Sequence, residues 1–208
     1  GKFNMDNNYT VLARKYRSQD FNSLIGQDVL VKTLTTAINT GRIAHAYIFT
    51  GIRGTGKTST ARILAKALNC LSSDGPTATP CGVCENCRAI AAGQHIDGMG
   101  IDAASHTGVD NIRDILDAAQ YRPTNGRYKV YIIDEVHMLT DSAFNALLKT
   151  LEEPPEYVVF ILATTEVQKL PATILSRCMR FDFKLISENE LISHLKYIFD
   201  DSKIKYEE

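Results

Sequence analysis

Residues 51–58 read GIRGTGKT, and this segment decides the expected fold because it matches the full phosphate-loop pattern G-x-x-x-x-G-K-[ST]. The short apolar run HAYIFT precedes it, and TSTARILAKALN follows it with the spacing of a helix. A Gly-rich turn alone can match the pattern by chance, but a strand before it and a helix after it are the context that the motif requires. The segment therefore predicts an α/β domain that binds phosphate groups.

The residue types of this loop suit a nucleotide. Its glycines let backbone N–H groups turn toward phosphates, and the helix N-terminus adds a favourable dipole. Lys57 can reach the β- and γ-phosphates, and the Thr58 hydroxyl can ligate Mg²⁺. The predicted nucleotide contacts here are Gly51, Gly54, Thr55, Gly56, Lys57, Thr58 and Ser59.

An acidic pair, Asp134 and Glu135, lies at the end of the strongest predicted strand, which is contained in KVYIIDEVHML at residues 129–139. An acid in this position can hold Mg²⁺, and its neighbour can orient the attacking water. The alternative is a solvated turn, which explains poorly a charged pair directly after buried positions. We expect His137 to pack or hydrogen-bond nearby rather than to act as a base.

Four of the five cysteines have the spacing C-x10-C-x2-C-x2-C, at Cys70, Cys81, Cys84 and Cys87. This spacing suits tetrahedral thiolate ligation of a structural Zn²⁺, because no ligand position is left open. The surrounding residues 70–87 contain few large apolar side chains, so a metal can offset an ordering entropy that a core cannot. Reduced structural cysteines and a redox pair are the alternatives. Cys178 is expected to be an ordinary buried thiol.

Apolar strands alternate with helices along the chain, which predicts a parallel sheet with helices on both faces. The expected strands lie at 45–51, at 95–105, within 129–139, at 156–165 and at 179–183. The expected helices lie at 29–43, 58–69, 109–120, 141–153 and 170–177, with a last one opened by the capping box of Ser187 and Glu190. Gly98 and Gly100 weaken the second strand.

Composition limits the classes of function. The net charge is −1 and the pI about 6.6, so any DNA contact has to be local or shared among subunits. No secretory signal and no bilayer-length apolar run is found, which favours a cytoplasmic protein without a membrane partner. Residues 1–8 are taken as a flexible start, with GKFN before Met5 as an expression remnant.

Several segments together resemble the gamma/tau subunits of the bacterial clamp loader, which are AAA+ ATPases. The matching segments cover most of residues 9–208 and are VLARKYR, GIRGTGKTS, CGVCENC, DEVHML, FNALLKTLEEPP, LATT, KLPATILSRC and RFDF. The resemblance implies an ATPase domain at 9–186 with an inserted zinc module at 70–87, and the beginning of a helical lid at 187–208. It also implies the strand order 5-1-4-3-2.

The same resemblance implies a function and roles for residues. The chain would be the ATP-hydrolysing motor subunit that drives loading of the sliding clamp onto primer-template DNA, within the DNA polymerase III holoenzyme. ATP, Mg²⁺ and Zn²⁺ would be its cofactors, and other loader subunits its partners in a hetero-oligomer, expected to be a pentamer. Mg²⁺ would be held by Thr58 and Asp134, catalysis would involve Lys57 and Glu135, Thr164 or Thr165 would sense the γ-phosphate, and Arg177 would reach a neighbour's ATP. The adenine would lie against Val11, Leu12, Arg14, Tyr16, Ile25 and Gly26.

Three departures from the family pattern affect these expectations. Ser18 replaces a proline near the adenine loop, and Gly98 and Gly100 replace larger strand residues. His106 and Gly108 stand where relatives have basic residues facing DNA, which leaves backbone N–H groups and Arg113 for such contact.

Three other functions fit the sequence less well. A DExH-type helicase needs two complete sheet domains, and the sequence shows one. A non-catalytic loader scaffold would lack an intact phosphate loop or acidic pair, and both are intact here. A zinc-dependent DNA-binding module would be more basic. The sequence therefore favours the ATPase.

Overall fold

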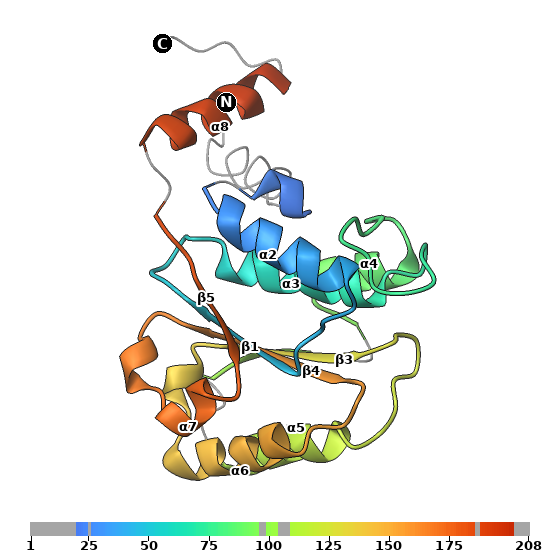
Figure 1. Ribbon diagram of the computed structural model, residues 1–208, viewed down its shortest axis with the longest axis vertical. Coiled ribbons are helices and arrows are strands. Elements are labelled where there is room, and N and C mark those ends of the chain that lie inside the picture. Colours follow the sequence, from blue (N-terminus) through green and yellow to red (C-terminus); the bar gives the residue numbers. More distant parts are fainter. Residues whose placement is uncertain (1–19, 25, 96–98, 104–108, 186–187, 202–208) are drawn as a thin grey trace, which may run out of the picture.

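The computed structural model describes residues 20–24, 26–95, 99–103, 109–185 and 188–201, and a parallel five-stranded sheet forms its centre (Figure 1). The strands are β1 (Ala46–Thr50), β2 (Met99–Asp102), β3 (Lys129–Asp134), β4 (Val158–Thr164) and β5 (Met179–Asp182). Their order is β2-β3-β4-β1-β5. Read from the other edge this is 5-1-4-3-2, so the predicted order is confirmed.

The strand register brings the carboxyl ends of the central strands together. Thr50, at the end of β1, lies opposite Thr164 of β4 and Asp182 of β5. On the other side of β4, Ile133 of β3 pairs with Leu162, so Asp134 ends its strand at the same edge of the sheet. This edge is where open α/β sheets bind ligands.

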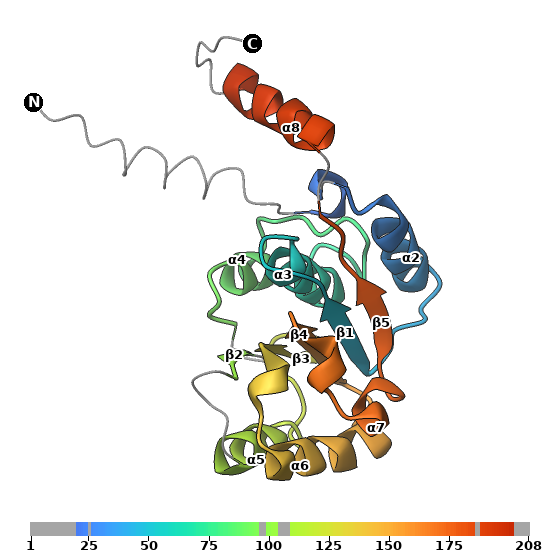
Figure 2. The ribbon, with the colours of Figure 1, turned by 90° about the vertical axis from the view of Figure 1, so that its left-hand side faces the viewer.

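Helices cover both faces of the sheet (Figures 1 and 2). On one face lie α2 (Asp28–Asn39), α3 (Lys57–Asn69) and α4 (Glu85–Ala91), and on the other lie α5 (Val109–Ala118), α6 (Asp141–Glu152) and α7 (Ala172–Leu175). Neighbouring residues of β1 serve opposite cores: Tyr47 and Phe49 pack with α2 and α3, whereas Ile48 packs with α5 and α6. Burial on both faces explains why the strands read as continuous apolar runs.

Most predicted elements form where the sequence places them. The Thr140 hydroxyl accepts a hydrogen bond from the Ala143 N–H (3.2 Å) and caps α6, which ends before Pro154 as expected. The third strand ends at the acidic pair as predicted, where Glu135 takes a left-handed conformation and η2 (Val136–Met138) follows. Short 3₁₀ helices also occur at η1 (Phe21–Ser23) and η3 (Val167–Lys169).

The second strand is shorter than the predicted 95–105, although Gly100 lies within it, opposite Ile132. A helix in the predicted lid segment is confirmed as α8 (Glu188–Asp201), which lies beyond the end of β5 and apart from the sheet (Figures 1 and 2). Several expectations fall outside the described residues: those for residues 1–8, Val11, Leu12, Arg14, Tyr16, Ser18, Ile25, Gly98, His106, Gly108 and Ser187.

Candidate nucleotide-binding site and cysteine cluster

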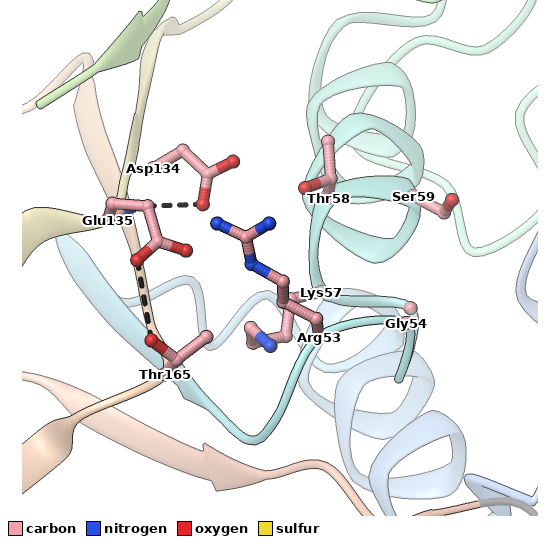
Figure 3. A pocket seen from close by; sticks show the side chains of 9 residues that line it. Arg53, Gly54, Lys57, Thr58, Ser59, Asp134, Glu135 and Thr165 are labelled. Atoms are coloured by element: carbon pink, nitrogen blue, oxygen red, sulfur yellow. Dashed lines mark hydrogen bonds between the residues drawn. The ribbon is translucent and has the colours of Figure 1, made fainter. Parts of the chain in front are cut away.

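The phosphate loop, the acidic pair and the end of β4 surround one pocket of about 430 Å³ (Figure 3). The loop connects β1 to α3, and its side of the pocket faces the carboxyl ends of β3 and β4. The lining residues are Arg53, Gly54, Gly56, Lys57, Thr58, Ser59, Asp134, Glu135 and Thr165. The fold therefore brings together predicted site residues from three separate segments of the chain.

Two glycines of the loop occupy positions that other residues fit poorly. Gly51 has φ +145°, and a Cβ there would lie 2.9 Å from the Phe183 carbonyl oxygen on the chain that continues β5. Gly56 has φ +97° and directly precedes α3. These conformations turn the backbone tightly, so that the N-terminus of α3 faces the pocket.

Lys57 is buried inside the loop. Its Nζ donates hydrogen bonds to the carbonyl oxygens of Gly51 (2.5 Å) and Ile52 (2.7 Å). Burial lowers the pKa of Lys57, and the negative charges of Glu135 and Asp134 partly oppose that shift. The ammonium thus rests on backbone acceptors of its own loop, close to the acids across the pocket.

The acidic pair is held by the backbone at the end of β3. An Asp134 carboxylate oxygen accepts a hydrogen bond from the Glu135 N–H at 3.0 Å. Glu135 has φ +51° and ψ +45°, and among the described residues no other non-glycine has a positive φ. Such strain costs about 1–3 kcal/mol and concentrates at functional sites, here a residue whose side chain lines the pocket.

The structure distinguishes the two threonines at the end of β4. Thr165 lines the pocket, and its hydroxyl donates to Glu135 Oε2 at 3.3 Å. Thr164 is fully buried, and its hydroxyl lies 2.8 Å from Nδ1 of His137. Of the two, Thr165 is therefore the one placed to contact a bound group. The expectation that His137 makes hydrogen bonds nearby is confirmed.

The donor set of the pocket fits a magnesium nucleotide. Thr58 offers a hydroxyl and Asp134 a carboxylate, and both line the pocket (Figure 3). Oxygen donors are those that Mg²⁺ prefers, usually from one or two side chains together with phosphates and waters. Lys57 and the N-terminus of α3 supply the positive potential that phosphates need.

Two residues near the loop were missed by the sequence argument. Arg53 extends its guanidinium into the pocket toward Asp134 (Figure 3), and its place inside the motif was the available signal. Gln27 follows Gly26 and is buried, and its Nε2 donates to the carbonyl oxygens of Lys184 (2.8 Å) and Thr55 (3.4 Å). Gln27 therefore ties the N-terminal segment to the loop and to the chain after β5, and no local pattern predicts such a bond.

Arg177 lies outside this pocket. It follows α7, its side chain is half exposed, and its NH2 group lies 3.7 Å from Glu152 Oε1. Asp182 is instead paired elsewhere, and its Oδ1 accepts bonds from Arg180 Nε (2.8 Å) and the Thr50 hydroxyl (2.5 Å). The structure thus leaves Arg177 on the surface, held by one long ion pair of the kind that contributes little stability.

The four clustered cysteines converge at the other end of α3. The Sγ atoms of Cys70, Cys81, Cys84 and Cys87 all lie within 4.8 Å of one another. Four sulfurs that bind one zinc ion tetrahedrally, with Zn–S bonds of ~2.3 Å, also lie within this distance of one another. The sulfur positions can therefore hold a zinc ion. Cys178 is separate from the cluster: it is half-buried against the core below the sheet, where burial raises its pKa to about 12.

Backbone N–H groups surround the cluster and favour thiolates. Cys81 Sγ accepts hydrogen bonds from the N–H groups of Val83 (3.4 Å) and Cys84 (3.2 Å), and these bonds lower the pKa of Cys81 to about 6. Cys84 Sγ accepts in the same way from Cys87 N–H (3.4 Å) and caps α4. Burial instead raises the pKa of Cys87, because a buried thiolate with no cation beside it is unfavourable. The donors and the sulfur positions fit a zinc ion.

Buried amides fasten the cluster to the sheet domain. Asn86 Nδ2 donates to the carbonyl oxygens of Asn69 (2.9 Å) and Asn125 (3.0 Å), and its Oδ1 bonds His95 Nε2 (2.9 Å). Asn69 in turn accepts bonds from the N–H groups of residues 127 and 128. The cysteine segment is therefore joined to the end of α3 and to the loop that leads into β3.

Comparison with known protein families identifies the chain. A family model described as "DNA polymerase III, delta subunit" matches residues 26–187. The chain belongs to this family. The match includes the phosphate loop, the cysteine cluster and the acidic pair.

Curated relatives of this DNA polymerase III family member are subunits named tau or gamma. The chain is 55% identical over 199 residues to DNA polymerase III subunit tau of Escherichia coli, covering 96% of this chain and 31% of that protein. It is 54% identical over 200 residues to subunit tau/gamma of Haemophilus influenzae, covering 96% and 29%. The chain spans about a third of the length of these relatives, and the resemblance to gamma/tau subunits is confirmed.

Solved structures share the fold of this chain. The Holliday junction branch migration motor RuvB of Thermotoga maritima aligns with a TM-score of 0.64 at 19% identity, over 92% of this chain and 56% of that one. A gamma subunit-related protein from the same organism aligns with a TM-score of 0.53 at 23% identity, over 82% and 53%. None of the helices in the described ranges has the length and apolar character needed to cross a membrane.

Proposed function

We propose that this chain is the ATP-binding and ATP-hydrolysing domain of a clamp-loader subunit in the DNA polymerase III holoenzyme. The observation that supports this best is the pocket in which Lys57 and Thr58 face Asp134, Glu135 and Thr165. A non-catalytic scaffold has no need for a complete set of these groups. Its relatives are named as DNA polymerase III subunits, and the proposed setting is DNA replication in the bacterial cytoplasm.

Each side chain has a role in this proposal. Lys57 and the N–H groups at the start of α3 hold the phosphates, and Thr58 and Asp134 hold Mg²⁺, whose charge neutralises that developing on the phosphates. Glu135 orients the attacking water through its carboxylate. Thr165, bonded to Glu135, is placed to respond to the presence of a γ-phosphate.

The proposal also covers the contacts of the adenine base and a lid over the nucleotide. The adenine is proposed to lie against Val11, Leu12, Arg14, Tyr16, Ile25 and Gly26, and Gln27 fixes the end of that segment beside the loop. The chain after β5 leads to α8, proposed as the first helix of a lid over the nucleotide. A protein that contains the rest of the lid is expected to bind ATP more tightly than residues 1–208 alone.

The proposed partners are further loader subunits in a hetero-oligomeric pentamer, the sliding clamp and primer-template DNA. The exposed position of Arg177, outside its own pocket, is compatible with action on ATP held by an adjacent subunit. The four cysteines are proposed to hold one Zn²⁺ that orders residues 70–87 and takes no part in hydrolysis. For DNA, Arg113 is exposed near the start of α5 and is available for backbone contact.

Glu135→Gln in the full-length subunit, assembled with its partners, tests the proposal. Gln keeps the shape of Glu135 but cannot activate water, so ATP turnover should fall by at least about 10³-fold while ATP affinity stays close to that of the unmodified protein. Lys57→Ala, measured in parallel, should weaken ATP binding itself. Normal turnover with Glu135→Gln in every active subunit would contradict the assignment.

A further inference from the structure

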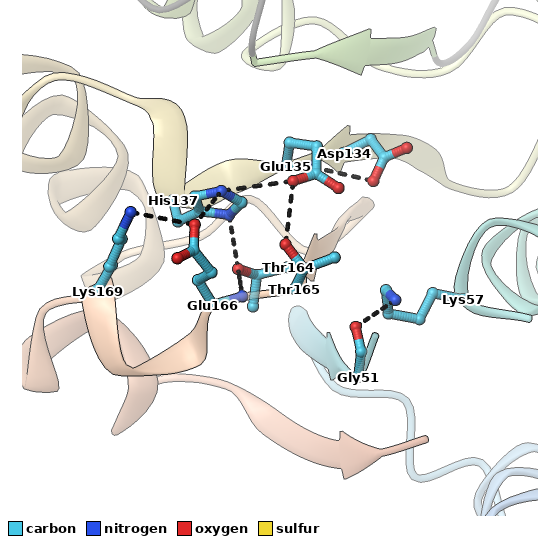
Figure 4. Close-up of polar contacts among 9 residues, drawn as sticks. All are labelled: Gly51, Lys57, Asp134, Glu135, His137, Thr164, Thr165, Glu166 and Lys169. Carbon is cyan, nitrogen blue, oxygen red and sulfur yellow. Dashed lines mark hydrogen bonds and ion pairs between the residues drawn. The ribbon is translucent and has the colours of Figure 1, made fainter. Parts of the chain in front are cut away.

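His137 lies behind the acidic pair, with a hydrogen-bond partner at Nδ1 and two carboxylates close to Nε2 (Figure 4). Its side chain is only 4% exposed. Nδ1 lies 2.8 Å from the Thr164 hydroxyl, and Nε2 lies 3.4 Å from Glu135 Oε2 and 3.2 Å from Glu166 Oε2. A buried imidazole between two carboxylates, one of them the proposed water-orienting group, is more than the packing of a core requires.

The two carboxylates beside Nε2 indicate where the ring carries a hydrogen. Ionised carboxylate oxygens only accept hydrogen bonds, so a favourable contact with them needs a hydrogen on Nε2. The Thr164 hydroxyl oxygen accepts a bond from the Glu166 N–H at 3.0 Å and can donate its own hydrogen to Nδ1 of His137. The Nε2–H then faces the carboxylates of Glu135 and Glu166.

This arrangement fixes one oxygen of Glu135 and leaves the other directed into the pocket. Oε2 lies within reach of two donors, the Thr165 hydroxyl at 3.3 Å and His137 Nε2 at 3.4 Å. The second carboxylate oxygen turns toward the side of Asp134 and Lys57 (Figure 4). A carboxylate that is held by one oxygen presents the other in a constant position, which is what orientation of an attacking water requires.

Glu166 has its own anchor on the far side of the ring. Its Oε2 lies 3.1 Å from Lys169 Nζ, one turn further along the chain. The ring thus lies between the Thr164 hydroxyl on one side and the Glu166 carboxylate on the other.

We propose that His137 is a positioning residue for Glu135. Through its Nε2–H, and together with Thr165, it holds Glu135 Oε2 so that the free oxygen faces the nucleotide. This inference rests on the proposed function, since it takes Glu135 as the water-orienting group. His137 itself does not touch the nucleotide in this scheme.

A pair of His137 variants separates positioning from simple packing. In His137→Asn the side chain reaches Thr164 but offers no donor at the place of Nε2, whereas His137→Gln puts an amide N–H near that place. We expect His137→Asn to lower kcat by about 10- to 100-fold, the scale of effect for a misplaced catalytic group, and to leave ATP affinity unchanged. His137→Gln should restore most of the loss. Equal losses of kcat in both variants, or wild-type kcat in His137→Asn, would overturn the proposal.

A second pair avoids the buried ring and remains informative if His137→Asn does not fold. Thr165→Val removes the other donor to Glu135 Oε2, and Thr165→Ser keeps it. The valine variant should lose kcat and the serine variant should retain most of it; unchanged kcat in the valine variant would contradict the proposal. Glu135→Gln is measured alongside in the same assembled complex. If Glu135→Gln is inactive while His137→Asn keeps full kcat, this inference fails and the proposed function stands; if Glu135→Gln is active, the proposed function itself fails.

Discussion

The proposed nucleotide pocket and the cysteine cluster lie at opposite ends of α3, and their polar groups come from differently spaced parts of the chain. Lys57 opens the helix and faces a pocket of about 430 Å³ whose charged groups come from distant strands. Cys70 follows its last residue, and the cluster draws its four sulfurs from only 18 residues of chain, 70–87. The sheet therefore positions the pocket, whereas the cluster depends on local backbone bonds and on what its sulfurs bind.

The two regions also differ in what completes them. The proposed pocket needs a nucleotide and a group from outside, because the predicted finger Arg177 does not line it. The cluster has all four ligands in place and few large apolar residues, so a metal ion within the chain would complete it. Contacts between subunits should therefore change ATP hydrolysis at the pocket strongly. Loss of stability at the cluster should remain confined to that segment.

Arg177→Ala gives the largest expected effect and tests whether the pocket is completed from outside. In a mixed assembly, the change in one subunit should lower hydrolysis at the neighbour's site by about 10³-fold while ATP stays bound there, because a fixed guanidinium stabilises transition-state phosphate oxygens. Single-turnover hydrolysis with ATP-binding-deficient neighbours would locate the affected site. The proposal would have to be abandoned if only the subunit carrying the change lost activity.

Asn86→Ala gives a smaller effect and tests how the cluster is attached. Asn86 is buried and bonds Asn69, Asn125 and His95, so its loss leaves buried groups without partners and should cost about 1–3 kcal/mol in the stability of residues 70–91. Amide hydrogen exchange of α4 measures this, and Gln94→Ala, at an exposed position, is the control. ATP hydrolysis should not change. A large loss of hydrolysis, or exchange no faster than in the control, would contradict the separation of the two regions.

The sequence predicted the parts of the molecule that are set by local pattern. The phosphate loop, the cysteine spacing, the acidic pair and the strand–helix alternation were found because each is encoded in a short run of residues. The resemblance to a known family supplied the strand order, which periodicity alone does not contain. The short helix α4 was not predicted, because its seven residues lie within the cysteine segment and hardly show a helical period.

What the sequence did not predict depends on tertiary contacts. Whether Thr164 or Thr165 faces the pocket follows from the register of β4, and the left-handed backbone of Glu135 has no local signal. The bonds of Gln27 and of His137 join segments far apart in the chain, from residue 27 to 184 and from 137 to 164. No local signal marks such pairs, because they exist only after the sheet has formed.

The central claim is that the sheet positions the pocket residues, whereas a bound metal orders the cysteine segment. Removal of zinc tests this claim most directly. The full-length subunit is stripped with a chelator, and bound zinc, amide exchange of residues 70–91 and the Kd for Mg-ATP are measured before and after. The account predicts about one zinc per chain before treatment, loss of amide protection in this segment after it, and a Kd that changes by less than about threefold, since binding energy of the order of 10 kcal/mol is lost only locally. Absence of zinc in untreated protein, retained protection after stripping, or a Kd that rises by more than about tenfold would contradict it.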